Sequence, residues 1–394
     1  YTLINIRTMT KKKFLLVNYE YPPLGGGGGN ATYSIAKELA KEGVNVTVLT
    51  CSFRDIPRYQ KRENIQVIRI WGGRRKLEKC SIFEMILFLF NGLLKSKSIS
   101  RKIKPDACLI FFSLPTGPIG WWIKRSLGIP YVISLQGGDV PGFMKKELHI
   151  YHLLTNFITQ NVWKNAEFVV SNSEGLSRLA KKFMDNAGHK TIPAGVDLQT
   201  FNPIGKSRMG SKTRLLFVGR LVYQKGLDIL LEALKEIKDS DLWSLDIIGD
   251  GPLRKEILEK AKSLQIDKNI NFYGWQSREQ LIKIYKDNDI FLIPSRDEGM
   301  PNVMLEAMAS GLAVIGTKVS GLEEVIINNQ NGFLVEKENP HELYEAIKNL
   351  IYNKSLIKEI GKNASLFVQK NYSWANAARS YKYLLEKEIG QVNE

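Results

Sequence analysis

Two acids stand eight positions apart in the stretch SRDEGMPNVMLEAMASG, residues 295–311, which also contains Ser295. The apolar run 290–293 before it predicts a buried parallel strand, and the break at Gly-Met-Pro predicts a loop before a helix over residues 302–310. Glu298 then lies in the loop and Glu306 on the helix, so both can face the free N–H groups of the first helical turn, which attract phosphate. If one of these acids lies beside a transferred group and the other hydrogen-bonds to sugar hydroxyls, the two would form a pocket for a nucleotide-sugar. The alternative is that Glu298 caps the helix and Glu306 is solvated.

A pair of cations, Arg220 and Lys225, follows the predicted strand 214–219 within one strand-to-helix loop. Loops at the carboxyl ends of parallel strands share one edge of the sheet, so both cations can converge on an anion there. A forked guanidinium and a point-charge ammonium together suit a diphosphate. Gly251 and Trp275 follow the next two strands on the same edge, where Trp275 could stack on a base. Solvated cations and a packed tryptophan are the alternatives.

Two glycine-containing loops in the first half of the chain could also approach a ligand. Five glycines at 25–29, including Gly28 and Gly29, separate the strand 14–19 from a helix expected over 30–42. Glycine lets backbone N–H groups come close to a phosphate, but this run lacks the third glycine and the later acid of a dinucleotide fingerprint. A flexible turn is the alternative. The second loop is Gln136-Gly137-Gly138-Asp139, which places Asp139 at the carboxyl end of the strand 131–135.

Strands alternate with helices along the whole chain, which predicts an α/β protein with two doubly wound parallel sheets. We expect the first sheet to end with a strand over 192–197, the stretch 202–212 to be a linker, and the first helix of the second sheet to cover 227–238. The expected domains are an N-terminal one, 1–202, with residues 1–8 outside the fold, a C-terminal one, 203–372, and a final helix, 373–394. That helix could pack back on the N-terminal domain.

The net charge of +16 is concentrated in the first half, where residues 1–200 hold 29 Lys and Arg against 14 Asp and Glu. This half is therefore expected to face an anionic partner. Basic residues flank the apolar run that starts at Ile82 and extends to Leu94, which is too short to span a bilayer but could lie in an anionic membrane surface. The alternative is a core helix with solvated basic ends. Nucleic acid is disfavoured because no binding motif accompanies the charge.

The three cysteines are widely spaced and the chain has no apolar signal core, which favours a reducing cytosol. We expect a cytoplasmic protein, with possible peripheral contact at the inner face of the plasma membrane. The four histidines are scattered along the sequence, so neither a metal site nor a bound cofactor is predicted.

Taken in order, these motifs resemble the retaining nucleotide-sugar glycosyltransferases of family four, which have the GT-B fold of two Rossmann-like domains facing across a cleft. The resemblance rests on the proline and glycine loop, Gly137-Gly138-Asp139, Gly-Val-Asp at 195–197, the Arg220 and Lys225 loop, Gly-Asp-Gly-Pro at 249–252, and the two acids with Leu-Glu-Ala-Met. It implies that Arg220 and Lys225 hold the donor diphosphate, Glu306 the ribose and Glu298 the donor sugar. Asp139 is expected to be catalytic, and Gly28 and Gly29 to lie near acceptor and phosphate. The other expected donor-binding residues are Gly299, Met300, Pro301, Asn302, Ser295, Gly251, Trp275 and Gln136.

The family pattern differs at two points in this chain. Gln136 stands where many relatives have His, and Met300 and Asn302 replace part of the usual Glu-x-Phe-Gly core. The expected activity is transfer of a hexose or N-acetylhexosamine from a nucleotide-sugar, with UDP favoured, to a glycan or lipid-linked phosphate acceptor for cell-surface polysaccharide or glycolipid. An epimerase, a phosphorylase and a catalytically inactive membrane scaffold are the alternatives.

Overall fold

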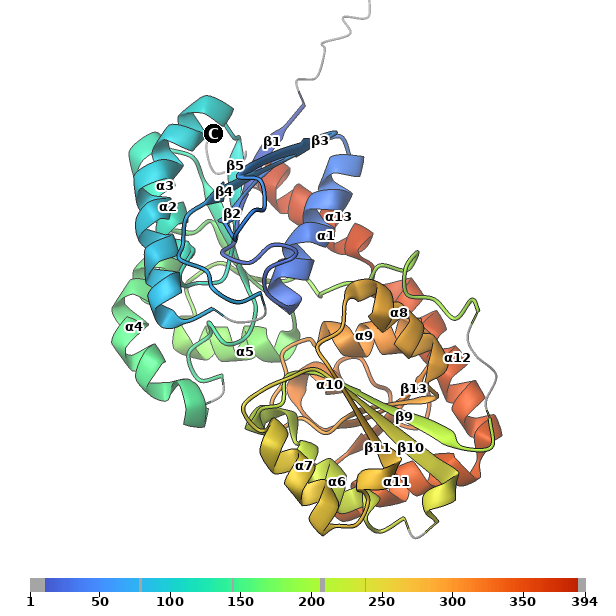
Figure 1. Cartoon of the computed structure of the whole chain (residues 1–394). Helices are drawn as coiled ribbons and strands as arrows, with labels where there is room; N and C mark the ends of the chain where they lie inside the picture. The colour runs from blue at the N-terminus through green and yellow to red at the C-terminus, as the bar shows by residue number, and fades with distance from the viewer. Residues whose placement is uncertain (1–10, 78–79, 144, 206–209, 238, 389–394) are drawn as a thin grey trace, which may run out of the picture.

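A computed structural model describes residues 11–77, 80–143, 145–205, 210–237 and 239–388. The expectation for residues 1–8 lies outside these described residues. The chain forms two lobes, each built on a parallel sheet with helices on both faces (Figure 1).

The first lobe has eight strands within the described residues, in the order β3-β4-β2-β1-β5-β6-β7-β8. Its strands are β1 (Lys13–Val17), β2 (Asn45–Cys51), β3 (Tyr59–Arg62), β4 (Ile65–Ile70), β5 (Ala107–Phe111), β6 (Tyr131–Leu135), β7 (Phe168–Ser171) and β8 (His189–Thr191). Its helices are α1 (Gly27–Lys41), α2 (Ile82–Ile103), α3 (Gly117–Leu127), α4 (Lys145–Asn165) and α5 (Glu174–Phe183). All neighbouring strands are parallel except β3 and β4.

The second lobe has six parallel strands within the described residues, in the order β11-β10-β9-β12-β13-β14. They are β9 (Thr213–Val218), β10 (Trp243–Ile248), β11 (Ile270–Gly274), β12 (Ile290–Ile293), β13 (Ala313–Thr317) and β14 (Phe333–Val335). The α-helices are α6 (Leu227–Leu234), α7 (Arg254–Ser263), α8 (Arg278–Asp287), α9 (Asn302–Ala309), α10 (Ser320–Glu323), α11 (Pro340–Tyr352), α12 (Lys354–Asn371) and α13 (Trp374–Tyr383). Three short 3₁₀ helices, η1 (Tyr223–Lys225), η2 (Ser240–Leu242) and η3 (Asp267–Asn269), and the π-helical segment η4 (Leu384–Glu388) complete the described part.

The prediction of two doubly wound parallel sheets is confirmed. The central strands are buried on both faces, so their sequences are continuous apolar runs such as Ile290–Ile293, in which all four residues are buried. Three boundaries were wrong. The first sheet ends with β8 instead of residues 192–197, α1 begins at Gly27 instead of residue 30, and α6 ends at Leu234 instead of residue 238. Strand β3, whose four residues are all exposed, was not predicted.

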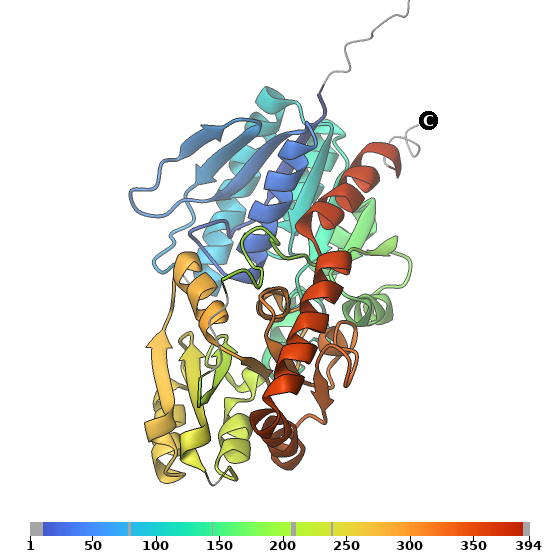
Figure 2. The same cartoon turned by 90° about the vertical axis from the view of Figure 1, so that its right-hand side faces the viewer.

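The last helix returns from the second lobe to the first. α13 packs against α1, and Figure 2 shows the two helices together in the upper lobe. The Tyr381 hydroxyl lies 2.7 Å from Ser134 Oγ, and Lys382 Nζ lies 3.6 Å from Glu42 Oε2. Because α13 continues directly from α12 of the second lobe, it ties the two lobes together.

Helix α2 has two different faces. One face buries Phe88, Gly92 and two serines against the first lobe, whereas the other leaves an apolar stripe exposed. The stripe consists of Ile82, Phe83, Ile86, Phe90 and Leu94, each more than half exposed. The helix therefore belongs to the fold and also presents an apolar surface. Across the described residues, we find no helix with the length and apolarity that crossing a membrane requires.

Candidate active site

Glu298 and Lys225 meet where the loop after β12 passes the loop after β9. Lys225 Nζ lies 2.5 Å from Glu298 Oε1, and the Ser295 hydroxyl donates to the same oxygen at 2.7 Å. Both charged side chains are largely buried, and Ser295 is fully buried. A buried ion pair is retained only with good geometry and additional hydrogen bonds, which Ser295 supplies here. One acid and one cation predicted from distant motifs are thus direct partners.

Hydrogen bonds and close packing between the same two loops fix Lys225 in place. Gly226 has φ of +64°, and a Cβ there would lie 2.0 Å from the Pro294 carbonyl oxygen. The Gln224 side-chain amide donates to the Asp297 carbonyl at 2.7 Å, and the Arg296 N–H donates to the Gln224 carbonyl at 2.8 Å. Only glycine permits this conformation and this close approach.

Arg296, which was not predicted as a site residue, anchors the loop that carries Asp297 and Glu298. Its guanidinium contacts Asp228 Oδ2 at 2.7 Å and Glu338 Oε1 at 2.6 Å, and it stacks 3.8 Å from the centroid of the Tyr223 ring. The signal was present in sequence, because this arginine directly precedes Asp297-Glu298. Its three partners lie 42 to 73 positions away, however, and only the fold brings them together.

Arg220 is exposed at the same edge, in a loop that the Gly249 and Gly251 turn supports. The Leu221 N–H donates to the Asp250 carbonyl at 3.0 Å, and a Cβ at Gly251 would lie 2.3 Å from the Leu221 carbonyl oxygen. The charge of Arg220 acts across the lobes on Glu20, which follows β1. Burial raises the pKa of the Glu20 carboxyl, whereas Arg74, the Gly26 N–H and Arg220 lower it. Glu20 was also missed, although it follows a strand end as the predicted site residues do.

Glu306 lies on α9 with partners of its own. The Tyr285 hydroxyl donates to Glu306 Oε2 at 3.1 Å. Burial raises the pKa of Glu306 from 4.5 to about 7, against the opposing effects of Arg278 and the Tyr285 hydroxyl. A carboxyl group with this pKa changes charge near neutral pH, which is common at functional sites.

The glycine loop of the first lobe reaches the start of α9. Asn302 Nδ2 donates to the Gly27 carbonyl at 3.3 Å, across 275 positions of sequence. A Cβ at Gly28 would lie 2.6 Å from the Phe112 ring, and one at Gly29 would lie 2.8 Å from the Leu24 carbonyl oxygen. The glycines therefore permit close packing within the lobe as well as contact between lobes.

Asp139 and Gln136 point into their own lobe. The Asp139 carboxylate accepts backbone N–H bonds from Ser113, Gln136 and Gly137 at 2.8, 2.9 and 3.0 Å. Burial raises its pKa while these donors lower it. The Gln136 amide donates to Ser134 Oγ at 2.9 Å. Both side chains thus hold the turn after β6, and among the described residues their side-chain hydrogen bonds all stay within the first lobe.

The remaining predicted residues differ in burial and in what they contact. Met300 and Pro301 are buried, with Met300 in the hydrophobic core, so their backbone is what the loop can offer a ligand. Gly299 lies against the first lobe, where a Cβ would be 3.4 Å from Asn172 Oδ1. Trp275 is 57% exposed and has no ring contact with another described site residue.

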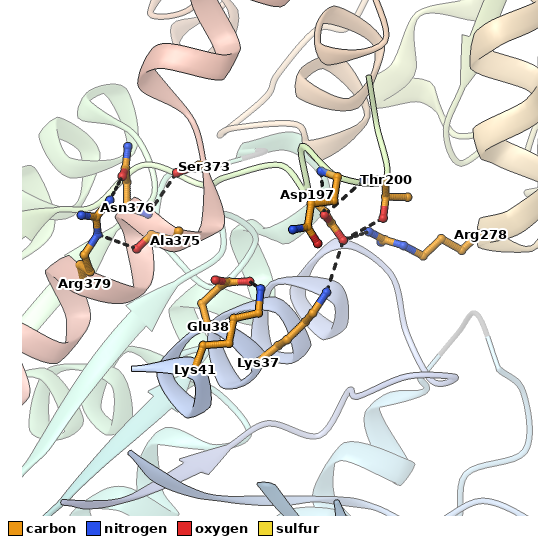
Figure 3. Close-up of polar contacts among 11 residues, drawn as sticks. Lys37, Glu38, Lys41, Asp197, Thr200, Arg278, Ser373, Ala375, Asn376 and Arg379 are labelled. Carbon is orange, nitrogen blue, oxygen red and sulfur yellow. Dashed lines mark hydrogen bonds and ion pairs between the residues drawn. The ribbon is translucent and has the colours of Figure 1, made fainter. Parts of the chain in front are cut away.

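Two polar contacts hold the lobes around this region. The Glu324 carboxylate beside α10 accepts from the backbone N–H groups of Glu174 and Gly175 at 2.8 and 2.7 Å, capping α5 of the other lobe. Before the expected linker, Figure 3 shows Asp197 between Lys37 of α1 and Arg278 of α8, with Oδ2 3.7 Å from Lys37 Nζ and 3.6 Å from Arg278 Nη2. The Glu20, Arg220, Lys225, Glu298 and Asn302 region therefore lies between lobes that are in direct contact.

Comparison with known proteins agrees with this architecture. The model "Glycosyltransferase Family 4" matches residues 25–200, and the model "Glycosyl transferases group 1" matches residues 203–367. An uncharacterized glycosyltransferase of Methanocaldococcus jannaschii is 30% identical over 77% of this chain and 82% of that relative. Sucrose-phosphate synthase from Thermosynechococcus elongatus superimposes with a TM-score of 0.86 at 21% identity, covering 97% of this chain and 100% of that one.

A further structural neighbour is Anabaena HepE in complex with UDP-glucose, with a TM-score of 0.74, 16% identity, and coverage of 95% of this chain and 99% of that one. The two family models together match most of the chain, and the similarity to solved structures covers both lobes. The chain therefore belongs to glycosyltransferase family four of the group 1 glycosyl transferases and has the GT-B fold.

Proposed function

We propose that this glycosyltransferase moves a hexose or N-acetylhexosamine from a UDP-sugar to a glycan or lipid-linked acceptor, with retention of the anomeric configuration. The observation that carries the proposal is the buried pair of Lys225 and Glu298 beside the start of α9, at a contact between the two lobes. The complex of UDP-glucose with Anabaena HepE, a structural neighbour, supports UDP as the nucleotide.

Lys225 and Arg220 would stabilise the leaving diphosphate. In the structure Lys225 is paired with Glu298, so a bound diphosphate would take over the ammonium group and free the Glu298 carboxylate for the donor sugar. The N–H groups of the first turn of α9 would add positive potential at the phosphate. Preorganised charge aimed at the group that becomes more negative lowers the barrier most, because the site needs no reorganisation during the reaction.

Glu306 would accept hydrogen bonds from the ribose hydroxyls, and the departing phosphate would take the proton of the acceptor hydroxyl on the face where the bond breaks. Asp139 would act as a positioning residue, because three backbone N–H groups already occupy its carboxylate. Gln136, in the place of the usual histidine, would likewise hold the turn after β6.

We further propose peripheral contact with an anionic membrane through the first lobe. Besides the apolar stripe of α2, helix α4 exposes Ile150, Leu153, Leu154 and Phe157, each more than 60% exposed. α3 contacts both helices, and Figure 1 shows all three along the same side of the lobe. Exposed apolar side chains next to excess Lys and Arg are typical of proteins that bind a membrane surface.

The test is transfer of radiolabelled sugar from a panel of nucleotide-sugars, comparing Lys225→Ala and Arg220→Ala with Lys255→Ala, an exposed lysine on α7. Each of the first two changes should lower kcat by roughly 10²-fold, about 3 kcal/mol, as for removal of one strong electrostatic donor. Lys255→Ala should retain the parent activity. Parent-level kcat in both site variants would refute the assignment, and donor binding without turnover by the wild type would favour the inactive scaffold.

A further inference from the structure

A cavity lies in the first lobe, outside the residues assigned to the donor. It has a volume of about 530 Å³ and is lined by the segments that follow β2 and β4 and by the start of α2. Its lining residues are Ser52, Phe53, Arg54, Arg58, Trp71, Gly73, Arg74, Arg75, Phe83 and Leu87. They include four arginines and no acid. Because β2 and β4 are parallel, both segments leave the same edge of the sheet, where ligands bind in folds of this kind.

Arg74 lies in the wall of this cavity, and the protein covers its guanidinium group. Its side chain is fully buried, with Nε donating to the Lys76 carbonyl at 2.9 Å and Nη2 to the Leu77 carbonyl at 3.1 Å. Within the described residues Nη1 has no hydrogen-bond partner, and the nearest paired acid, Glu20, lies 3.9 Å from Nη2. Because the Arg74 side chain has no accessible surface, it adds positive charge from behind the cavity wall and does not contact a molecule in the cavity. Arg54, Arg58 and Arg75 line the cavity and are exposed, so these three arginines can contact a bound anion.

The cavity adjoins the glycine loop that contacts the second lobe. The Gly25 N–H donates to the Leu77 carbonyl at 2.8 Å, and the Gly26 N–H donates to Glu20 Oε2 at 3.3 Å. Glu20 thus lies between Arg74 on the cavity side and the loop that reaches Asn302. The segment after the lining residues Arg74 and Arg75 therefore contacts the glycine loop directly.

An apolar surface begins at the same cavity. Phe83 and Leu87 line it, while Phe83 is also 65% exposed and belongs to the stripe on α2. The stripe residues Ile82, Ile86, Phe90 and Leu94 recur every four positions, so they follow one side of the helix away from the cavity. The combination of an arginine cluster with an adjoining apolar stripe matches a molecule that has an anionic head and a hydrocarbon chain.

We propose that this cavity binds the phosphate or diphosphate of a lipid-linked acceptor and that the hydrocarbon chain lies along the exposed stripe of α2. The inference rests on the proposed function, because it identifies the acceptor of that reaction. Arginine suits the head group because its planar fork binds phosphate oxygens in pairs and keeps its charge.

The experiment measures binding by isothermal titration calorimetry with UDP at saturation, so that the donor diphosphate site is occupied. The probes are farnesyl diphosphate, inorganic pyrophosphate and farnesol. Farnesyl diphosphate should bind at least about tenfold more tightly than either of the others, since each of those lacks one half of the recognised structure. Equal affinity for inorganic pyrophosphate and farnesyl diphosphate would overturn the lipid assignment in favour of a free phosphate ligand.

Variants test the location. The double variant Arg54→Gln/Arg58→Gln should weaken farnesyl diphosphate binding about tenfold or more, and Phe83→Ser should weaken it without changing pyrophosphate affinity. The matched controls are Arg125→Gln/Arg178→Gln, two exposed arginines of the same lobe outside the cavity, and Leu366→Ser, an exposed leucine on α12 of the other lobe. All substituted residues are exposed, and UDP affinity with thermal melting confirms folding of each variant.

Equal farnesyl diphosphate affinity in the cavity variants and the controls would overturn the inference. Failure of the wild type to bind UDP contradicts the proposed function instead. In that case the same titrations without UDP still test the cavity, so the two failures are distinguishable.

Discussion

Because the pKa of Glu306 is raised, the free energy of unfolding depends on whether the Glu306 carboxyl group is charged near neutral pH. Burial raises this pKa from 4.5 to about 7, so the folded protein holds a proton that the unfolded chain has already released. The stabilisation from that proton is complete below the unfolded pKa and is lost as pH rises through about 7. Between pH 6 and pH 8 one such group changes the free energy of unfolding by up to about 1.4 kcal/mol. The side chain is partly exposed, so we expect about 1 kcal/mol.

The perturbation is Glu306→Gln, which keeps the size of the side chain and removes the titration. The Tm of the variant minus the Tm of the wild type should be roughly 1–2 °C larger at pH 8 than at pH 6. Differential scanning calorimetry at one fixed scan rate measures it, with Glu345→Gln, on helix α11, as the control for loss of a surface charge. A difference that stays constant, or that moves in favour of the wild type at pH 8, would show that Glu306 is ionised throughout this range and that the account of its burial is mistaken.

Two further predictions concern the packing between and beneath the site loops. Gly321→Ala should lower the free energy of unfolding by about 1–3 kcal/mol, because a Cβ there would lie within covalent distance of the Gly299 carbonyl oxygen. Thermal melts measure this change. The control is Gly210→Ala, which should be close to neutral because Gly210 has open space around it. Glu324→Ala removes the cap on α5 and should increase the radius of gyration measured by small-angle X-ray scattering. The control Glu323→Ala, at the exposed neighbouring residue, should leave the radius unchanged. Equal radii for the two variants would mean that the cap does not hold the lobes together.

The local chemistry of the site could be predicted from sequence because it follows strand ends. An apolar run such as that of β12 indicates a buried parallel strand, and the polar residues after it must lie at the carboxyl edge of the sheet. Glu298 and Lys225 were therefore expected in one region, and they are ion-paired in the structure. The two predicted sheets are confirmed. The roles assigned to individual site residues remain predictions.

The predicted elements were wrong where side-chain burial does not follow the period of a helix or a strand. The strand β3 was missed because an exposed edge strand carries no apolar signal, and the start of α1 was misplaced because its first turn consists of glycines, which have low helix propensity. The stripe on α2 could not be separated from a core face, since both are apolar. The sequence shows which residues are apolar but not which side of a helix the rest of the fold covers.

By itself, the sequence determined the alternation of strands and helices, the two-sheet class and the loops that carry the charged residues, because these depend on local periodicity and on glycine and proline positions. Only the tertiary structure decided that Asn302 meets Gly27, that Arg296 supports the acidic loop, and that Arg74 lies buried beside a basic cavity next to the apolar stripe. Such contacts join segments tens to hundreds of positions apart. They are selected by the packing of whole lobes, and no local pattern encodes them.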